Sequence, residues 1–301
     1  MISVIMLTYN RETQVFRAIE SILSQTFRDF EFIIVDNGST DRSGTIADEY
    51  AARDNRIRVI HKERGNIGSG RNAGLDTAPG EYIAFIDDDD WCDPDYLEFL
   101  YALAVGNSAD AAICGSADKA VNEKCVMTAE EAIIELLWRQ KYNVAFPTKL
   151  FKTALFEGVR FSDAAKYDDI ELMPRILSGA SRIAYHSLPK YTFERHGGNN
   201  SAWTTNHTLL DAATLDEYIA VYRQRTEWLC GRFPDNAAYW RYFELSFMIS
   251  MVEKVTRLEL AECYPYRNGL VRELRAHCGE FIDGEHTRKF EKEWMKTYVH
   301  T

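Results

Sequence analysis

Residues 82–94, YIAFIDDDDWCDP, are the stretch that decides the fold of this chain. The apolar run Tyr82–Ile86 predicts a buried strand, and the four aspartates Asp87–Asp90 follow at its carboxyl end. Open α/β sheets bind ligands at that end of their strands. Two carboxylates about 4 Å apart repel each other by roughly 4 kcal/mol at an effective dielectric of about 20. A strand end that keeps several of them ionised therefore predicts a bound cation, Mg²⁺ or Mn²⁺, with phosphate oxygens as further ligands.

Strand-like and helix-like patterns alternate from the first residues to about residue 115. Strands are predicted at 2–7, 31–35, 57–61, 82–86 and 109–114, and helices at about 15–23, 40–51, 71–77 and 94–105. Alternation at this spacing predicts an α/β fold with a mainly parallel sheet, right-handed crossovers and flanking helices. Thr128 and Glu131 have the spacing of a capping box, which starts a further helix that runs to about Arg139.

Composition and charge exclude several classes of protein. The net charge of −11 leaves no basic surplus to displace the counterions of a phosphate chain, so a general nucleic-acid binder is excluded. The six cysteines show no C-x-x-C pair and no metal-ligand spacing, which favours reduced thiols in a cytoplasmic protein. The opening residues MISVIML lack a basic region, so we expect a strand there rather than a signal peptide. No run of about 18 apolar residues occurs, so we expect no membrane span, while peripheral attachment at the inner face of a membrane stays open.

Five blocks in register give the chain a resemblance to family-2 glycosyltransferases, which are sugar transferases with the A-type nucleotide-binding fold. The blocks are Ser3–Arg11, Ser24–Phe27, Ile34–Asp41, Asn66–Gly74, and Gly80–Asp90 with Pro94. Fainter similarity continues at Lys149–Phe151, Gly158–Phe161, Tyr167–Asp169 and His196–Ser201. The resemblance implies an A-type glycosyltransferase fold in residues 1–205 and an enzyme that uses a nucleotide sugar.

The resemblance implies a nucleotide site at the carboxyl ends of the first two strands. Leu7 and Asp36 would hold the base, usually uracil, and Asp36 would accept its imide hydrogen. A carboxylate that accepts a ring N–H discriminates well in a desolvated pocket. Tyr9 would stack on the base or flank it, and Arg71 would lie near the nucleotide. The residues alone leave other roles open: Tyr9 as a loop aromatic, Asp36 as a turn former and Arg71 as a helix-surface charge.

The same resemblance divides the aspartate cluster by role. Asp87 takes the position of a ribose contact, and Asp89 takes that of the carboxylate that bridges the metal. Together they would hold Mn²⁺ or Mg²⁺ against the donor diphosphate. Asp88 replaces a residue that is often serine in this group, and we place it among the donor-binding residues. His196 lies in a glycine-containing loop that the family closes over the diphosphate, where a neutral imidazole is a competent metal ligand.

The candidate catalytic base lies in the pair Asp168-Asp169, which follows Tyr167. Inverting transfer is an in-line displacement at the anomeric carbon and needs a base opposite the departing diphosphate. The family uses the aspartate of a Glu-Asp pair after an aromatic residue, so Asp169 matches the base and Asp168 replaces the glutamate. Adjacent carboxylates raise the pKa of one member, which suits a base near neutral pH. Which of the two takes the proton stays open, and both also suit the first turn of a helix.

The resemblance therefore implies a metal-dependent, inverting glycosyltransferase. It would move a sugar from a nucleotide-diphosphate donor, UDP-sugar first, to a glycan or lipid-linked acceptor in polysaccharide synthesis. Residues 1–115 would bind the nucleotide sugar, and residues 116–205 would carry the acceptor side and the base. Residues 206–301 are predicted to be helical and rich in aromatic residues. These helices have three uses open to them: packing within the chain, forming a homo-oligomer, or resting on a membrane surface.

Other functions fit parts of the sequence. Gly68–Gly74 imitates the dinucleotide fingerprint of an NAD-dependent oxidoreductase, but its third glycine is one residue late and a gap at 62–66 separates it from the preceding strand. A sugar nucleotidyltransferase would want a glycine-rich basic loop at Leu7–Arg11, which the chain lacks. An inactive glycan-binding domain is the non-enzymatic alternative, although every expected carboxylate is present. For Asp87–Asp90, the alternative is a solvated acidic turn that caps the next helix.

Overall fold

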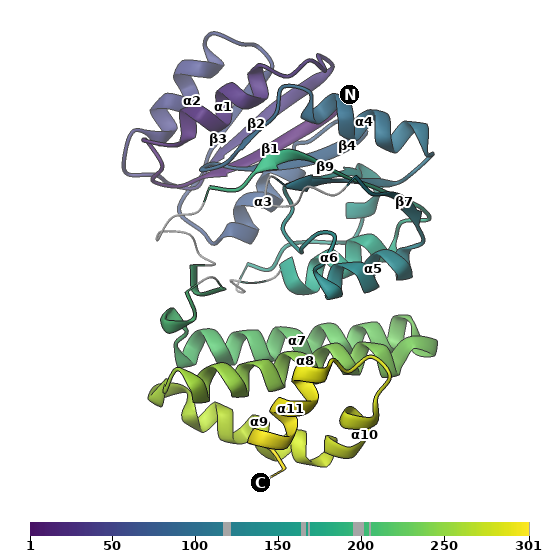
Figure 1. The fold of residues 1–301 in the computed structure, drawn as a ribbon. Coiled ribbons are helices and arrows are strands. Elements are labelled where there is room, and N and C mark those ends of the chain that lie inside the picture. Colours follow the sequence, from purple (N-terminus) through teal and green to yellow (C-terminus); the bar gives the residue numbers. More distant parts are fainter. Residues whose placement is uncertain (117–121, 164–166, 168, 195–201, 205, 301) are drawn as a thin grey trace. The chain divides into compact units, whose positions relative to one another are not determined.

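The computed structural model of the chain describes residues 1–116, 122–163, 167, 169–194, 202–204 and 206–300. Two of the predicted site residues, Asp168 and His196, lie outside this set. The chain divides into two compact units, Met1–Glu194 and Arg195–Thr301 (Figure 1). The first unit is an α/β sheet structure and the second is helical, so both predicted fold classes are confirmed.

The sheet of the first unit has the order β3-β2-β1-β4-β8-β6-β9-β5, with β7 paired to β9. Its strands are β1 Ile2–Thr8, β2 Phe30–Asp36, β3 Ile57–His61, β4 Tyr82–Asp87, β5 Trp91–Cys92, β6 Ala111–Ser116, β7 Lys124–Met127, β8 Lys149–Lys152 and β9 Ile183–Thr192. The four strands β3-β2-β1-β4 are all parallel, as predicted. Beyond them the sheet is mixed, because β8 enters antiparallel between β4 and β6.

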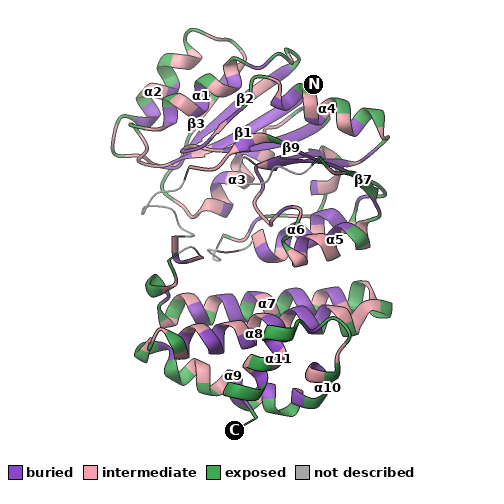
Figure 2. Ribbon diagram, in the orientation of Figure 1, coloured by how far each residue is buried: buried purple, intermediate pink, exposed green. Residues whose placement is uncertain are grey.

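Helices cover both faces of this sheet. They are α1 Val15–Leu23, α2 Ser43–Ala51, α3 Ile67–Leu75, α4 Tyr96–Gly106, α5 Ala129–Trp138 and α6 Asp169–Ser178, with a 3-10 turn at Thr153–Phe156. Figure 1 shows α1, α2 and α4 on one face and α3, α5 and α6 on the other. Strands covered on both faces are expected to be apolar throughout. Figure 2 accordingly shows the central strands as the buried layer, with exposed residues on the outer faces of the helices.

Two helix starts follow from side-chain caps that are readable in the sequence. The capping box at Thr128 is confirmed: its side chain accepts the N–H of Glu131, and the Glu131 carboxylate accepts the N–H of Thr128. Asn66 caps α3 in the same way by accepting the N–H of Ser69 at 2.8 Å. The predicted start of this helix at Arg71 is wrong, because the Asn66 cap starts it at Ile67.

Because α3 begins at Ile67, the glycines that imitate a dinucleotide fingerprint belong to this helix rather than to a loop before it. They lie inside α3, which packs against β1 and β2. A Cβ atom on Gly70 would stand 2.1 Å from Leu7 Cδ1, and one on Gly74 would stand 2.5 Å from Ile5 Cγ2. The glycines therefore allow a close approach of helix and strand, which accounts for them without a dinucleotide.

The second unit is a helical bundle. Its helices are α7 Ala212–Arg232, α8 Ala237–Arg257, α9 Tyr264–Ala276, α10 Cys278–Asp283 and α11 Lys289–Tyr298, with 3-10 turns at Ala202–Thr204, His207–Leu209, Pro234–Asn236 and Ala261–Cys263. Trp240 and Tyr242 of α8 are buried within the unit. The Glu291 carboxylate of α11, also buried, accepts hydrogen bonds from the hydroxyls of Tyr242 and Ser246. Among the helices described, none is long and apolar enough to cross a membrane.

Candidate functional site

The parallel register brings the predicted nucleotide-binding residues to one edge of the sheet. Leu7 of β1 pairs with Asp87 of β4, and Thr8 of β1 pairs with Asp36 of β2. The loops that leave these three strands therefore begin side by side. This edge is the carboxyl end of the parallel strands, where open α/β sheets bind their ligands.

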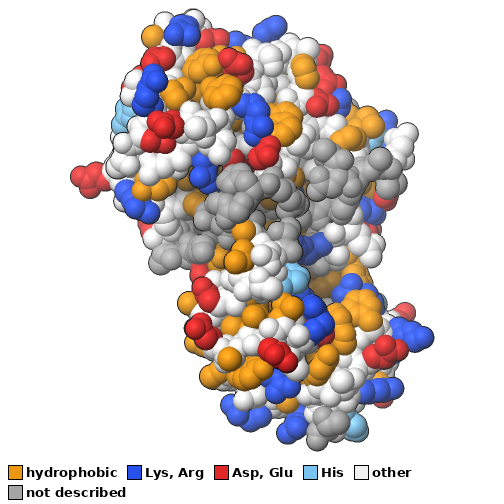
Figure 3. All heavy atoms as spheres, turned by 60° about the vertical axis from the view of Figure 1, so that its left-hand side comes forward, with side chains coloured by type: hydrophobic (Ala, Val, Ile, Leu, Met, Phe, Trp, Pro, Cys, Tyr) orange, Lys and Arg blue, Asp and Glu red, His pale blue; other side chains and the backbone are white. Residues whose placement is uncertain are grey.

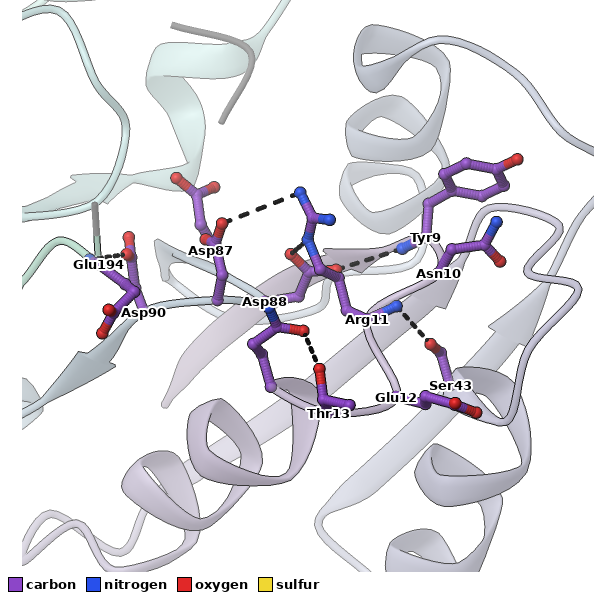
Figure 4. Close-up of polar contacts among 12 residues, drawn as sticks. Tyr9, Asn10, Arg11, Glu12, Thr13, Ser43, Asp87, Asp88, Asp90 and Glu194 are labelled. Carbon is purple, nitrogen blue, oxygen red and sulfur yellow. Dashed lines mark hydrogen bonds and ion pairs between the residues drawn. The ribbon is translucent and has the colours of Figure 1, made fainter. Parts of the chain in front are cut away.

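The loop after β1 is tied to the loop after β2 by several hydrogen bonds. Asn10 takes a left-handed conformation with φ 51°, and its N–H donates to Ser39 Oγ at 3.1 Å. Its side-chain oxygen accepts the N–H of Thr40 at 2.8 Å. Next to it, the N–H of Arg11 donates to Ser43 Oγ at 2.7 Å (Figure 4). These hydrogen bonds hold the backbone of the first loop in one conformation. They therefore fix the backbone positions from which the Tyr9 and Arg11 side chains extend.

Asp88 joins the first loop to the acidic cluster. Its Oδ2 accepts the N–H of Tyr9 at 3.2 Å, and its Oδ1 lies 3.6 Å from Arg11 Nε (Figure 4). Nη2 of the same arginine lies 4.0 Å from Asp89 Oδ2. Burial, followed by the charge of Asp89, raises the pKa of Asp88 to about 7. Asp88 thus works within the protein as an acceptor for the Tyr9 backbone and as a partner of Arg11.

Asp87 is the most exposed of the four clustered aspartates. Its side chain is 42% exposed, and its Oδ1 lies 3.6 Å from Arg71 Nη2. The Arg71 guanidinium also lies over the rings of Phe146 and Phe161, at 5.1 and 5.3 Å from their centroids. Protein packed around the Asp87 carboxylate removes much of its hydration and so raises its pKa. The charge of Arg71 opposes this rise. Arg71 and Asp87, which the resemblance assigned separately to the nucleotide site, therefore lie together at the sheet edge.

The Asp90 side chain is buried and has hydrogen-bond partners within the protein. Tyr191 donates its hydroxyl to Asp90 Oδ2 at 2.8 Å, and the N–H of Glu194 donates to Oδ1 at 2.7 Å. Burial, followed by the charge of Asp87, raises the pKa of Asp90 to about 8. Asp90 therefore fastens the chain just after β9 to the end of β4.

Arg17 and Arg64 also belong to this edge, although the motifs gave neither of them a role. Arg17 of α1 donates to the backbone oxygen of Asp89 at 2.6 Å and pairs with Glu194 at 3.1 Å. The Arg64 guanidinium lies 4.5 Å from the centre of the Tyr9 ring, which is cation–π distance. A contact of this kind depends on how loops meet in space, so spacing along the chain carries no signal for it.

Asp36 is almost fully buried and has two partners in the protein. It is 6% exposed, its Oδ1 accepts the N–H of Ser39 at 3.0 Å, and its Oδ2 lies 3.0 Å from His61 Nδ1. His61 Nε2 in turn lies 3.0 Å from Asp48. Hydrogen bonds to Asp36 and then Asp48 raise the pKa of His61. The turn-forming role that the sequence leaves open for Asp36 is present in its bond to Ser39.

Asp169, the predicted base, is the first residue of α6. It lies within electrostatic reach of Lys149, a lysine at the start of β8 that is 0% exposed. The Lys149 ammonium donates to the backbone oxygens of Asn143 at 2.8 Å and Ala145 at 2.5 Å. Burial lowers the pKa of Lys149 to about 7, and the charges of Cys114 and Asp169 oppose that change. In the sequence, Lys149 belongs only to the faint similarity at Lys149–Phe151, and its burial depends on the tertiary structure.

Two of the three predicted metal ligands, Asp87 and Asp89, lie among the described residues. They contain no group of three or more His, Cys, Asp or Glu side chains placed to hold a metal without help. Mg²⁺ and Mn²⁺ at nucleotide sites commonly use one or two protein carboxylates together with substrate phosphates and water. The accessible carboxylate of Asp87 fits a metal site shared with a substrate. The described residues do not fit a site in which protein side chains alone surround the metal.

Charged side chains of both signs are spread over the surface shown in Figure 3. On the face shown in Figure 3, lysines and arginines are interspersed with aspartates and glutamates. With a net charge of −11, a continuous basic track for a phosphate chain is not expected on this protein.

The sequence and the fold were compared with those of known proteins. The family model described as glycosyl transferase family 2 matches residues 3–166. GlyG of Streptococcus pneumoniae is 35% identical over 66% of this chain and 72% of its own length. GlyA of the same organism is 30% identical over 75% of this chain, and the putative glycosyltransferase EpsH of Bacillus subtilis is 34% identical over 65%. The matches span only 37% of GlyA and 61% of EpsH.

Solved structures share the fold at lower sequence identity. S. aureus TarS 1-349 in complex with UDP-GlcNAc matches 97% of this chain and 83% of its own, with a TM-score of 0.71 and 20% identity. The mannosyltransferase PcManGT of Pyrobaculum calidifontis, in complex with GDP-Man and Mn²⁺, matches 99% of this chain and 84% of its own, with a TM-score of 0.57 and 16% identity. The family model covers more than half of the chain and a relative above 30% identity is covered over most of its length, so the chain belongs to glycosyl transferase family 2.

Proposed function

We propose that this protein transfers a sugar from a nucleotide-diphosphate donor, most readily a UDP-sugar, to a hydroxyl of a glycan or lipid-linked acceptor. The observation that carries the proposal is the set of acids and arginines at the carboxyl edge of β1, β2 and β4. Family membership supports it. So does the fold shared with proteins solved in complex with UDP-GlcNAc and with GDP-Man and Mn²⁺.

In the proposed complex, the nucleotide lies across the ends of β1 and β2. Leu7 and Tyr9 form the apolar side of the base site, and Arg64 on the Tyr9 ring limits how far that ring can turn. Asp36 accepts the imide hydrogen through lone pairs that Ser39 and His61 leave free, since each carboxylate oxygen has two. Arg71 lies beside Asp87, where its charge can reach a ribose or a diphosphate.

Asp87 and Asp89 would hold the divalent ion, with His196 as a further ligand. The ion would supply charge neutralisation for the diphosphate as it departs. Asp88 serves donor binding indirectly, through the Tyr9 backbone and Arg11. Arg17 donates a hydrogen bond to the backbone oxygen of Asp89, which helps to fix the position of that residue and its carboxylate.

Asp169 would take the proton from the acceptor hydroxyl as the sugar inverts, with Asp168 beside it as the second member of the pair. Asp169 stands at the start of α6, and a carboxylate there is favoured by the helix dipole. The buried Lys149 lies within electrostatic reach of the Asp169 carboxylate. Residues 1–205 would form the catalytic domain, with residues 1–115 binding the donor. We place the protein in the cytoplasm, with peripheral contact at the membrane where a lipid-linked acceptor would be met, and residues 206–301 are candidates for that contact or for a homo-oligomer.

The test is a screen of several UDP-sugars, read as release of UDP with and without Mn²⁺. We expect metal-dependent release with at least one donor, and at least about a 100-fold loss in Asp169→Asn, since a positioned base contributes 10²–10⁴-fold. Proton NMR of the first product should show an inverted anomeric centre. Binding of NADH, release of pyrophosphate, or glycan binding without turnover would each refute glycosyl transfer, and a retained anomeric centre would remove Asp169 from the role of base.

A further inference from the structure

Arg11 stands between two of the four clustered aspartates on a loop whose backbone is fixed. Its Nε lies 3.6 Å from Asp88 Oδ1 and its Nη2 lies 4.0 Å from Asp89 Oδ2. These are ion-pair separations, longer than a hydrogen bond between the same groups. The Arg11 side chain is 27% exposed, and its guanidinium is attracted to both carboxylates without a close hydrogen bond to either.

The other three arginines at this edge have other partners, and of these the Arg64 guanidinium lies over the Tyr9 ring. Arg17 donates to the Asp89 backbone and pairs with Glu194. Arg71 pairs with Asp87 and packs over two phenylalanine rings. Arg11 thus places its charge within ion-pair distance of the Asp88 and Asp89 carboxylates together. A divalent ion bound to Asp89 would therefore lie close to the positive charge of Arg11.

We propose that Arg11 is the resident counter-cation of Asp88 and Asp89, and that it opposes divalent-metal binding until a donor diphosphate arrives. The inference rests on the proposed function, because it takes Asp89 as a metal ligand. A permanent positive charge beside a metal site repels the incoming ion, and the repulsion is only partly screened close to the protein. A diphosphate brings negative charge that attracts the ion and Arg11 at once, so the donor removes the penalty.

The consequence is cooperative binding of metal and donor. If UDP raises the affinity for Mn²⁺ by some factor, Mn²⁺ must raise the affinity for UDP by the same factor. Removing the charge of Arg11 should tighten Mn²⁺ binding to the protein alone and should shrink this factor. Keeping the charge while changing the side chain should leave both quantities nearly as they are.

The experiment is a titration of the full chain with Mn²⁺ alone, and again with saturating UDP, read by the EPR signal of free Mn²⁺. The variants are Arg11→Gln and Arg11→Met, which lose the charge, and Arg11→Lys, which keeps it. Arg42→Gln is the matched control, because Arg42 lies on the neighbouring loop, is 69% exposed and pairs with Glu49. We expect both neutral variants to bind Mn²⁺ alone at least threefold more tightly, and the other two to stay within twofold of the wild type.

Two outcomes separate this inference from the proposed function. If the wild type binds Mn²⁺ and UDP together but the neutral variants bind Mn²⁺ alone no more tightly than it does, the role of Arg11 is refuted and the function stands. If the wild type binds neither ligand, both proposals fail. Misfolding of both neutral variants, seen by circular dichroism, would also refute the inference, because it would show that the side chain is a structural anchor rather than a loosely held cation.

Discussion

Replacement of Lys149 by Met tests how far the site region depends on a buried charge. The Lys149 ammonium is enclosed beneath the loop that precedes β8, donates to two backbone oxygens there and faces Asp169 at a distance. Met has a similar length and no charge, so Lys149→Met removes the titration with little change in volume. The two carbonyls that lose their donor add an offset to the free energy of unfolding that does not depend on pH.

The expected effect follows from the pKa of Lys149, which burial lowers from 10.5 to about 7. Above about pH 7 the folded protein holds Lys149 neutral, while the unfolded chain still binds a proton up to about pH 10.5. Stability rises with pH wherever the unfolded state binds more protons. At about 1.4 kcal/mol per pKa unit, the wild type should gain roughly 3 kcal/mol over Lys149→Met between pH 6.5 and pH 9.5.

The assay is urea unfolding of both proteins at pH 6.5, 8 and 9.5, fitted for the transition of the first unit. The control is Lys152→Met on the same strand, whose lysine is 38% exposed and pairs with Asp110 at 2.9 Å. That ion pair raises the pKa of Lys152, so its contribution is fully present below about pH 10.5 and should not change over this range. A difference between wild type and Lys149→Met that stays constant within 1 kcal/mol from pH 6.5 to 9.5 would refute the reasoning.

Two further predictions concern the acidic cluster and the helical unit. Asp89→Ala should lower the rate of UDP release by at least about 100-fold, because a charge-stabilising group at a departing anion is worth several kcal/mol; full activity in that variant would discard Asp89 as a metal ligand. Glu291→Gln should destabilise the second unit by about 2–4 kcal/mol, because the buried carboxylate accepts bonds from Tyr242, Ser246 and Arg288. Thermal unfolding followed by circular dichroism measures this loss, and an unchanged midpoint would contradict it.

Much of the parallel half of the sheet was predictable because its signals are local. The apolar runs at 2–7, 31–35, 57–61 and 82–86 became β1 to β4 with ends that differ by one residue or less. A strand buried on both faces must be apolar along its whole length, so its ends are visible in the sequence. The capping box at Thr128 was equally visible, because both partners lie within four residues of each other.

The antiparallel part of the sheet was not predictable in the same way. Lys149–Lys152 is only four residues long and opens with a lysine, yet it enters between β4 and β6 as β8. Its place depends on the edges that β4 and β6 offer, and these edges exist only after both strands have folded. Asp169, Asp168 and His196 as catalytic or metal-binding residues remain predictions from resemblance.

The sequence by itself determined that an α/β sheet would end in a row of aspartates and that these aspartates would need cations. Local hydrophobic pattern and like-charge repulsion are sufficient for that conclusion. Only the tertiary structure placed particular cations beside them: Arg11 lies near Asp88 and Asp89, and Arg71 lies near Asp87. It also turned Asp90 toward Tyr191 and Asp36 toward His61. Side-chain partners of this kind come from segments far apart in the sequence, and their choice depends on distance and burial, which exist only in the folded protein.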